Sequence, residues 1–293
     1  MSEGVAKACV VGDPVAHSRS PMLHGYWLKT LGLPGSYARE RVTAPEFDGF
    51  ISGLRRRGYV GANITIPHKE AAFRAVARCD EAAQAIGAVN TVWYEGEALV
   101  GGNTDAYGFL AHLAATIPDW ARDTNRAVIL GAGGAARAVV HALLARGIEV
   151  ALVNRTLPRA HELADHFGGR PSVHSFDAAA QLLATADLLV NTTSLGMAGK
   201  EALAIDLSLM KAGTIVYDVV YVPVDTALLR SARQAGLRTV DGLGMLLHQA
   251  VPGFAKWFGV TPAVTPELRA LLEADITSAV DLKVLSDVQQ RPS

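Results

Sequence analysis

The chain has almost no excess of charge of either sign. Its 27 Lys and Arg residues are balanced by 28 Asp and Glu residues, which leaves a formal net charge of -1. Proteins that hold nucleic acid neutralise many phosphates with clustered basic side chains, and this composition offers no such surplus. We therefore expect no nucleic-acid partner.

Long apolar runs are also missing. No segment reaches the roughly 18 uninterrupted apolar residues of a membrane span, and the start of the chain has no basic stretch followed by an apolar run. Half of the residues (50%) are hydrophobic and 19% are charged, a balance typical of a protein with real cores. These features predict a cytoplasmic protein with no membrane partner.

Cysteine is scarce as well. Cys9 and Cys79 lie far apart, with no CxxC pair and no Cys/His spacing of the kind that binds zinc. A disulfide framework and a metal site therefore have no support, and we expect two reduced thiols and no metal.

What the sequence does contain is an alternation of short apolar runs and amphipathic stretches, which restarts near residue 127 with its own glycine-rich turn. This alternation predicts an α/β fold of two units, each built on a mostly parallel sheet, joined near Asp105–Gly108. The expected strands are 8–12, 36–42, 59–66, 89–94, 127–130, 149–153, 188–190, 214–217 and 238–240, and the expected helices are 21–33, 44–57, 70–77, 81–86, 106–116, 135–145, 224–234 and 243–258.

The glycine-rich turn has the spacing of a dinucleotide site. Gly131-Ala132-Gly133-Gly134-Ala135-Ala136 matches G-x-G-x-x-G/A, directly after one expected strand and at the start of the next helix. Gly131 allows the tight turn, Gly133 lets the backbone approach a pyrophosphate, and Ala136 permits close packing of helix on strand. The helix N-terminus offers unpaired N–H groups to the phosphates. The alternative is a flexible turn without a ligand.

The end of the next strand distinguishes two cofactors. An enzyme that uses NAD places a carboxylate about twenty residues after the glycine motif, for the ribose 2′-hydroxyl. This chain has Asn154-Arg155-Thr156 there instead. Arg155 can meet a 2′-phosphate through charge-assisted hydrogen bonds, so the sequence favours NADP. The alternative is a solvated arginine at a loop tip.

Polar residues gather after the strand ends of the first half, where open α/β sheets form their ligand crevices. They form four clusters, at Gly12–Pro21, Asn63–Lys69, Gly87–Thr91 and Gly102–Asp105. A lone lysine after a strand is usually a solvated charge, whereas lysine with Asp, Asn, Ser and Thr on converging loops can orient a small polyhydroxylated ligand. His17, His24, His68 and His248 have no partner at nucleophile or ligand spacing, so we expect structural roles for them.

Along nearly its whole length the chain resembles the shikimate dehydrogenases, and several motifs agree in their order. The matching segments are HSxSP at 17–21, N-[VI]-T-x-P-x-K at 63–69, GAVNT at 87–91, GxNTDxxG at 101–108, the glycine loop at 131–136, NRT at 154–156, NTTSLGM at 191–197 and GLGMLLHQ at 242–249.

The resemblance implies a role for each matching residue. Lys69 and Asp105 are the expected catalytic pair. Ser18 and Ser20, joined by Tyr221, are expected to hold a substrate carboxylate. The residues expected to hydrogen-bond the ring hydroxyls are Asn63, Thr65, Asn90 and Gln249. The residues expected to hold the cofactor are Gly131, Ala132, Gly133, Gly134, Ala135, Asn154, Arg155, Thr156, Thr192, Val219 and Gly242.

The resemblance also implies the reaction, which is reversible NADP-dependent reduction of 3-dehydroshikimate to shikimate, on the route to chorismate and the aromatic amino acids. It implies a substrate-binding domain at residues 1–106, completed by helices within 242–285, and a Rossmann-type NADP-binding domain at 107–241. Alternatives are a quinate/shikimate dehydrogenase that uses NAD(P), an aminoshikimate-pathway enzyme, and a non-catalytic NADP-binding protein. Val222 and Gly25 stand where many family members carry Asn, which leaves substrate preference open. The sequence allows either a monomer or a homodimer.

Overall fold

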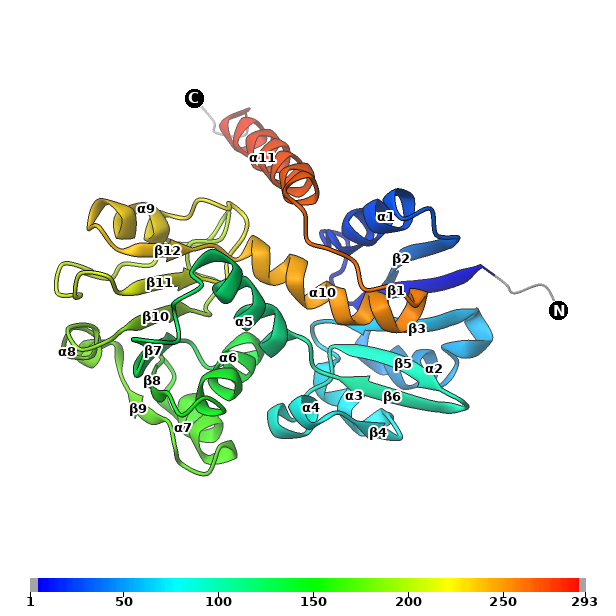
Figure 1. Cartoon of the computed structure of the whole chain (residues 1–293), viewed down its shortest axis with the longest axis horizontal. Helices are drawn as coiled ribbons and strands as arrows, with labels where there is room; N and C mark the ends of the chain where they lie inside the picture. The colour runs from blue at the N-terminus through cyan, green and yellow to red at the C-terminus, as the bar shows by residue number, and fades with distance from the viewer. Residues whose placement is uncertain (1–4, 290–293) are drawn as a thin grey trace. The chain divides into compact units, whose positions relative to one another are not determined.

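The computed structural model describes residues 5–289 of the chain, with side chains for 5–279. It divides into two compact units (Figure 1). The first unit ends at Gly108 and also contains Leu247–Leu268; the second contains Phe109–Leu246 and the chain from Arg269 onward. We expected residues 269–285 in the first domain, but they group with the second unit. The Arg269 guanidinium pairs with Asp241 of that unit, with 2.9 Å between Nη2 and Oδ2.

The first unit is built on a six-stranded mixed sheet in the order β2-β1-β3-β5-β6-β4. Parallel pairs join β1 to β2, β1 to β3 and β4 to β6, while β5 pairs antiparallel with both β3 and β6. The sequence did not predict the β5–β6 hairpin, because β6 is a short run rich in glycine. The strands are β1 Ala6–Gly12, β2 Gly35–Arg41, β3 Tyr59–Ile64, β4 Arg78–Cys79, β5 Thr91–Glu95 and β6 Ala98–Gly102.

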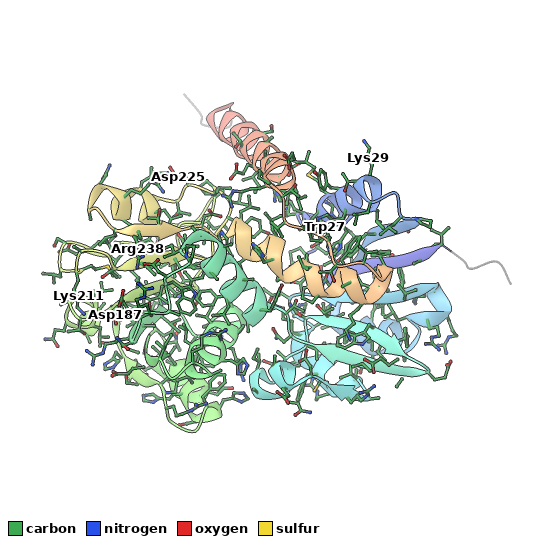
Figure 2. All side chains as sticks on the ribbon, in the orientation of Figure 1. Trp27, Lys29, Asp187, Lys211, Asp225 and Arg238 are labelled. Carbon is green, nitrogen blue, oxygen red and sulfur yellow. The ribbon has the colours of Figure 1, made fainter. Side chains whose placement is uncertain are left out.

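Helices cover this sheet with their apolar sides. Trp27 of α1 is 2% exposed and points into the core, whereas Lys29 of the same helix is exposed (Figure 2). The helix expected over residues 44–57 is broken into a 3-10 turn at Ala44–Glu46, α2 and a second 3-10 turn at Arg55–Arg57, because Gly53 ends α2 and Gly58 adopts a φ of 83°. The helices are α1 Ser20–Thr30, α2 Phe47–Ser52, α3 Lys69–Ala75 and α4 Glu81–Ile86.

Two long helices run from one unit into the other along the chain. The first, α5 (Asp105–Thr116), begins in the first unit, and α10 (Leu243–Phe258) ends there. The apolar side of α10 lies against the first sheet: Phe254 is fully buried, and the Trp257 indole N–H donates to the Val92 carbonyl at 2.9 Å. Glycine at position 61 allows this approach, because a Cβ there would lie 2.1 Å from Trp257 Nε1.

The second unit has an all-parallel six-stranded sheet in the order β12-β11-β10-β7-β8-β9, the strand order of dinucleotide-binding folds. The expected Rossmann-type sheet is confirmed. Its order reverses between β7 and β10, the position at which such sheets bind ligands. The strands are β7 Arg126–Leu130, β8 Glu149–Val153, β9 Ser172–His174, β10 Leu188–Asn191, β11 Ile215–Asp218 and β12 Arg238–Val240, and the helices are α6 Gly134–Leu144, α7 Leu157–His166, α8 Ala179–Leu183, α9 Ala227–Gln234 and α11 Pro266–Gln289, with a 3-10 turn at Phe176–Ala178.

Among residues 5–289, no helix has the combination of length and apolar character needed to cross a bilayer. No cluster of three or more His, Cys, Asp or Glu side chains within residues 5–279 is arranged to hold a metal ion. Cys9, which is buried, and Cys79, which is partly buried, are both free thiols.

Candidate active site

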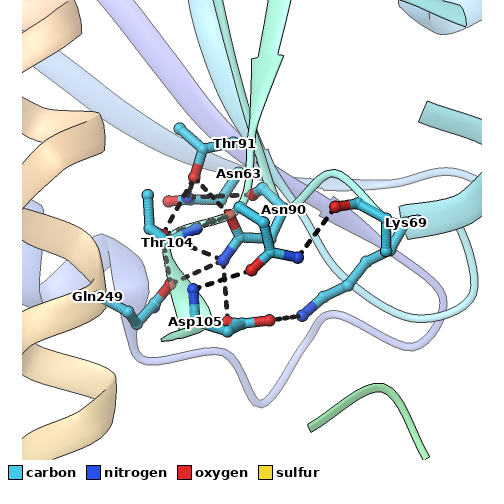
Figure 3. Close-up of polar contacts among 9 residues, drawn as sticks. Asn63, Lys69, Asn90, Thr91, Thr104, Asp105 and Gln249 are labelled. Carbon is cyan, nitrogen blue, oxygen red and sulfur yellow. Dashed lines mark hydrogen bonds and ion pairs between the residues drawn. The ribbon is translucent and has the colours of Figure 1, made fainter. Parts of the chain in front are cut away.

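Lys69 and Asp105 form an ion pair in the first unit. The Lys69 ammonium lies 2.5 Å from Asp105 Oδ2, and the two side chains are 25% and 12% exposed (Figure 3). Each stands at the first residue of a helix that follows a strand end, Lys69 on α3 and Asp105 on α5. Partial burial weakens solvent screening of the pair, while each group keeps some access to solvent. The structure therefore brings together the two residues expected to be catalytic.

The backbone at Lys69 is held by its neighbours. His68 is 2% exposed, its Nε2 lies 2.6 Å from the Val42 carbonyl, and its ring stacks on Phe47 with 4.5 Å between centroids. The Lys69 carbonyl accepts from the Val89 N–H at 2.9 Å. His68 thus has the structural role expected of it, and the start of α3 is fixed on both sides.

Asp105 owes its position to the two residues before it. Asn103 Oδ1 accepts from the Asp105 N–H at 3.1 Å, and Asn103 Nδ2 donates to the Ala88 carbonyl at 2.9 Å. The Thr104 N–H donates to Asn90 Oδ1 at 2.8 Å. Because α5 begins at Asp105 itself, this carboxylate belongs to the first helical residue and not to the N-cap, and it pairs with Lys69.

A set of amides and hydroxyls surrounds the ion pair (Figure 3). Asn90 Nδ2 donates to Asp105 Oδ1 at 2.8 Å and lies 3.3 Å from Gln249 Oε1. Asn63 Nδ2 donates to the Thr91 hydroxyl at 3.1 Å, since the register of β3 and β5 places these two residues opposite each other. Three residues expected to bind ring hydroxyls, Asn63, Asn90 and Gln249, thus lie in one network with the pair. Thr91 belongs to it too, although the sequence analysis did not single it out.

Ser18 lies in the loop between β1 and α1, and Ser20 is the first residue of α1. The Ser20 N–H donates to Ser18 Oγ at 3.3 Å, and the Ser18 carbonyl accepts from Arg39 Nε at 2.9 Å and Nη2 at 2.6 Å. The forked donors of Arg39 therefore fix this loop, a role with no sequence signal because β2 lies far along the chain. Thr65, just after β3, packs close to Gly12: a Cβ at residue 12 would lie 2.4 Å from the Thr65 methyl.

The remaining predicted residues all lie in the second unit. Tyr221 follows β11 and is partly buried. Val219 and Gly242 lie side by side, because a Cβ at residue 242 would come within 2.2 Å of the Val219 carbonyl oxygen. The loop from Val219 to Tyr221 is held by Asp218, a buried carboxylate that the sequence analysis did not single out.

Asp218, at the end of β11, is hydrogen-bonded to the end of β10, to the loop after β11 and to the residue that precedes α9. Its carboxylate accepts from Asn191 Nδ2 at 2.9 Å, from the Thr226 hydroxyl at 2.7 Å and from the Val220 N–H at 3.1 Å. Burial raises the pKa of Asp218, and these three donors offset part of that effect. The Asn191 side chain also orders Thr193, whose hydroxyl donates to Asn191 Oδ1 at 2.7 Å. Asp218 thus links the loop after β10 to the loop after β11.

The glycine loop between β7 and α6 fits a pyrophosphate. Gly131 has a φ of 107°, and a Cβ there would lie 2.7 Å from Thr192 Oγ1, so only glycine is accommodated. Gly133 is the N-cap of α6, and no side chain caps the helix N-terminus. A Cβ at Gly133 or Gly134 would meet nothing within 4 Å, so space lies over the first N–H groups of α6. Open space and uncapped donors are what an anion at a helix N-terminus requires.

The turn after β8 presents a cation to solvent. Asn154 Nδ2 donates to the Thr156 carbonyl at 2.8 Å and shapes the turn, and Thr156 is the N-cap residue of α7. Arg155 between them is exposed and has no ion-pair partner within the described part of the chain. An unneutralised guanidinium at this position matches a 2′-phosphate.

Comparisons with known proteins agree with this geometry. The profile of the family "Shikimate dehydrogenase substrate binding domain" matches residues 10–92, and that of "Shikimate / quinate 5-dehydrogenase" matches residues 112–241. The chain is 56% identical to the shikimate dehydrogenase (NADP(+)) of Brucella abortus (strain S19), over 93% of this chain and 96% of that protein.

Solved structures are similar as well. Shikimate 5-dehydrogenase from Thermus thermophilus, in complex with NADP(H) and shikimate, has a TM-score of 0.80 and 37% identity, covering 92% of this chain and 99% of that one. Quinate dehydrogenase from Corynebacterium glutamicum, in complex with NAD, has a TM-score of 0.85 and 29% identity, covering 92% and 99%.

An all-parallel dinucleotide-type sheet in one unit and a lysine–carboxylate pair among amides in the other define a two-unit α/β oxidoreductase. With the family profiles and the identity to relatives added, the chain belongs to the shikimate dehydrogenase family.

Proposed function

We propose that this chain catalyses the reversible, NADP-dependent reduction of 3-dehydroshikimate to shikimate. The observation that carries the proposal is the Lys69–Asp105 ion pair, 2.5 Å between Nζ and Oδ2, set among the amides of Asn63, Asn90 and Gln249. The name of the Brucella relative and the ligands of the Thermus structure support the same substrate and cofactor.

The substrate is proposed to lie on the first unit. Ser18 and Ser20 hold the ring carboxylate through their hydroxyls. Asn63, Thr65, Asn90 and Gln249 hydrogen-bond the ring hydroxyls. Amides suit this task because each offers both a donor and an acceptor to a hydroxyl.

The cofactor is proposed to lie on the second unit. The N–H groups at Gly131–Ala135 receive the pyrophosphate, Arg155 pairs with the 2′-phosphate beside Asn154 and Thr156, and Thr192, Val219 and Gly242 line the rest of the site. When bound, NADPH supplies the hydride that reduces the C3 carbonyl.

Lys69 acts as the general acid in the reductive direction. As the C3 carbonyl oxygen gains negative charge, the Lys69 ammonium donates a proton to it and stabilises the charge that has developed. Asp105 holds the Lys69 ammonium in place through the ion pair. In the oxidative direction the neutral Lys69 amine takes the proton back from the C3 hydroxyl.

A spectrophotometric assay tests the proposal directly. Purified protein is given shikimate or quinate with NADP or NAD, and absorbance is followed at about 340 nm, where reduced nicotinamide absorbs. Shikimate with NADP should give the highest kcat/KM. The similarity to a quinate dehydrogenase crystallised with NAD makes quinate with NAD the competing pair, and Arg155 argues against it. Cofactor binding without turnover of either ring acid would contradict the proposal.

Location and assembly are parts of the same proposal. We place the protein in the cytoplasm, where fractionation of cells carrying the tagged chain would find it. Light scattering on the purified protein distinguishes the monomer from the homodimer, both of which the sequence allows.

A further inference from the structure

The hydrogen bonds around the ion pair have a common direction. An ionised carboxylate can only accept, so Asp105 requires donors on both oxygens. Lys69 Nζ donates to Oδ2 at 2.5 Å and Asn90 Nδ2 donates to Oδ1 at 2.8 Å. The Asn90 amide must therefore turn its NH₂ group toward Asp105 and its carbonyl away. If the amide were reversed, its oxygen would face the carboxylate.

The orientation of Asn90 is passed on to its neighbours in β5 and β3. The Asn90 carbonyl oxygen accepts from the Thr91 hydroxyl at 2.9 Å, which commits the single hydroxyl proton of Thr91. The Thr91 oxygen is then an acceptor, and Asn63 Nδ2 donates to it at 3.1 Å. Asn63 must therefore present its own carbonyl oxygen to the other side.

The series ends at Tyr37 in β2, whose hydroxyl donates to Asn63 Oδ1 at 2.6 Å. The Tyr37 ring is fixed by the flat ring of His24, 4.0 Å away between centroids, and by Trp257 at 5.9 Å. Burial raises the pKa of Tyr37 well above its ordinary value, so the hydroxyl remains a donor at neutral pH. In each hydrogen bond of the series from Tyr37 to Asp105, the donor thus lies on the Tyr37 side and the acceptor on the Asp105 side.

We infer that Tyr37 is a positioning residue of the active site. It orients the Asn63 amide and, through Thr91, reinforces the orientation that Asp105 and the Thr104 N–H impose on the Asn90 amide, which donates to Asp105. Tyr37 does not itself contact the ion pair. Its hydroxyl acts on the pair through Asn63 and Thr91, and it also lies within hydrogen-bonding reach of the Ser20 side chain. The inference rests on the proposed function, because the Lys69–Asp105 pair is what these amides serve. It predicts that removing one phenolic oxygen slows the chemical step.

The test compares Tyr37→Phe, Thr91→Val and the double variant with the wild-type protein. Loss of one buried hydrogen bond should lower kcat roughly fivefold to tenfold in Tyr37→Phe, with the KM for NADP unchanged. The double variant should lose little more than the worse single variant, because both changes interrupt one series of bonds. Tyr59→Phe is the matched control, since Tyr59 in β3 donates to Glu40 outside this series. It should leave kcat unchanged.

A second measurement does not depend on turnover. In protein labelled with ¹⁵N-asparagine, hydrogen exchange of the Asn63 and Asn90 side-chain amides should quicken roughly tenfold in Tyr37→Phe and not in Tyr59→Phe. Unchanged exchange overturns the inference, as do strictly additive losses of kcat. If the wild-type protein fails to oxidise shikimate but exchange quickens as expected, the proposed function fails and the orientation of the amides by Tyr37 stands.

Discussion

Acid should destabilise the first unit through one buried histidine. His24 of α1 is fully buried, with its ring stacked on Tyr37 and Trp27 packed edge-on at 5.7 Å between centroids. Neither ring nitrogen makes a hydrogen bond in the described structure. Burial disfavours the charged imidazolium and lowers the pKa of His24 from 6.5 to about 3, an effect that the nearby Asn63 amide offsets only in part.

The size of the effect follows from the two protonation equilibria. As the pH falls below 6.5 the unfolded chain binds a proton at His24, while the folded protein keeps the ring neutral down to about pH 3. The stabilising contribution of neutral His24 is therefore fully present above pH 6.5, and it is lost progressively as the pH falls toward 3. Each pH unit in this window removes about 1.4 kcal/mol from the free energy of unfolding, so two units remove roughly 3 kcal/mol.

His24→Phe isolates this contribution, because it keeps an aromatic ring against Tyr37 and cannot be protonated. Urea unfolding followed by tryptophan fluorescence, at about pH 7 and about pH 4.5, should show wild-type protein losing about 2–3 kcal/mol more than the variant. Three of the four tryptophans (Trp27, Trp93 and Trp257) lie in this unit, so most of the signal reports on it. His161→Gln, at an exposed position of α7, is the control and should behave as wild type. Equal acid sensitivity of His24→Phe and wild type would refute the reasoning.

Three further substitutions test the site. Lys69→Ala should lower kcat by about 10²–10⁴ through loss of the proton donor, while fluorescence titration gives an NADPH affinity near that of wild type; a loss confined to cofactor binding would contradict the role. Arg155→Gln should weaken NADP binding roughly 10-fold to 100-fold and leave NAD binding unaffected, as calorimetry would record; equal losses for both cofactors would exclude a 2′-phosphate contact. Gly131→Ala should abolish NADP binding and lower the free energy of unfolding by about 1–3 kcal/mol, because residue 131 has a φ of 107° and faces Thr192. Thermal melting with and without NADP measures both effects. Wild-type behaviour of the variant would contradict the requirement for glycine in this turn.

Much of the architecture could be predicted because local patterns decide it. The restart of strand and helix at residue 127 with a glycine turn predicted the second sheet, and the apolar side of Leu243–Phe258 predicted a helix that needs a core. The errors came where local pattern is weak. Strand β6 is rich in glycine, and the 44–57 stretch is interrupted by Gly53. Arg269 of α11 meets Asp241, a contact between distant segments that no local pattern predicts.

The site divides in the same way. Lys69, Asp105 and Asn90 stand in recognisable motifs after strand ends, so the sequence singled them out. Tyr37 and Arg39 stand in an ordinary strand and matter only because β2 lies beside β1, which brings them to Asn63 and Ser18. Asp218 likewise has its role because β10 and β11 are neighbours, which brings its carboxylate to the Asn191 side chain. Roles that arise from contacts between distant segments leave no local pattern.

The short link between β6 and α5 determines where this chain can be lengthened. From Gly102 to Asp105 the chain has two intervening residues, Asn103 and Thr104, and both hold the helix start through side-chain or backbone bonds. An inserted residue here would turn the carboxylate away from Lys69. The hairpin turn at Gly96 is solvent-facing and its glycine has open space around it, so a loop or affinity tag grafted there would leave the ion pair undisturbed.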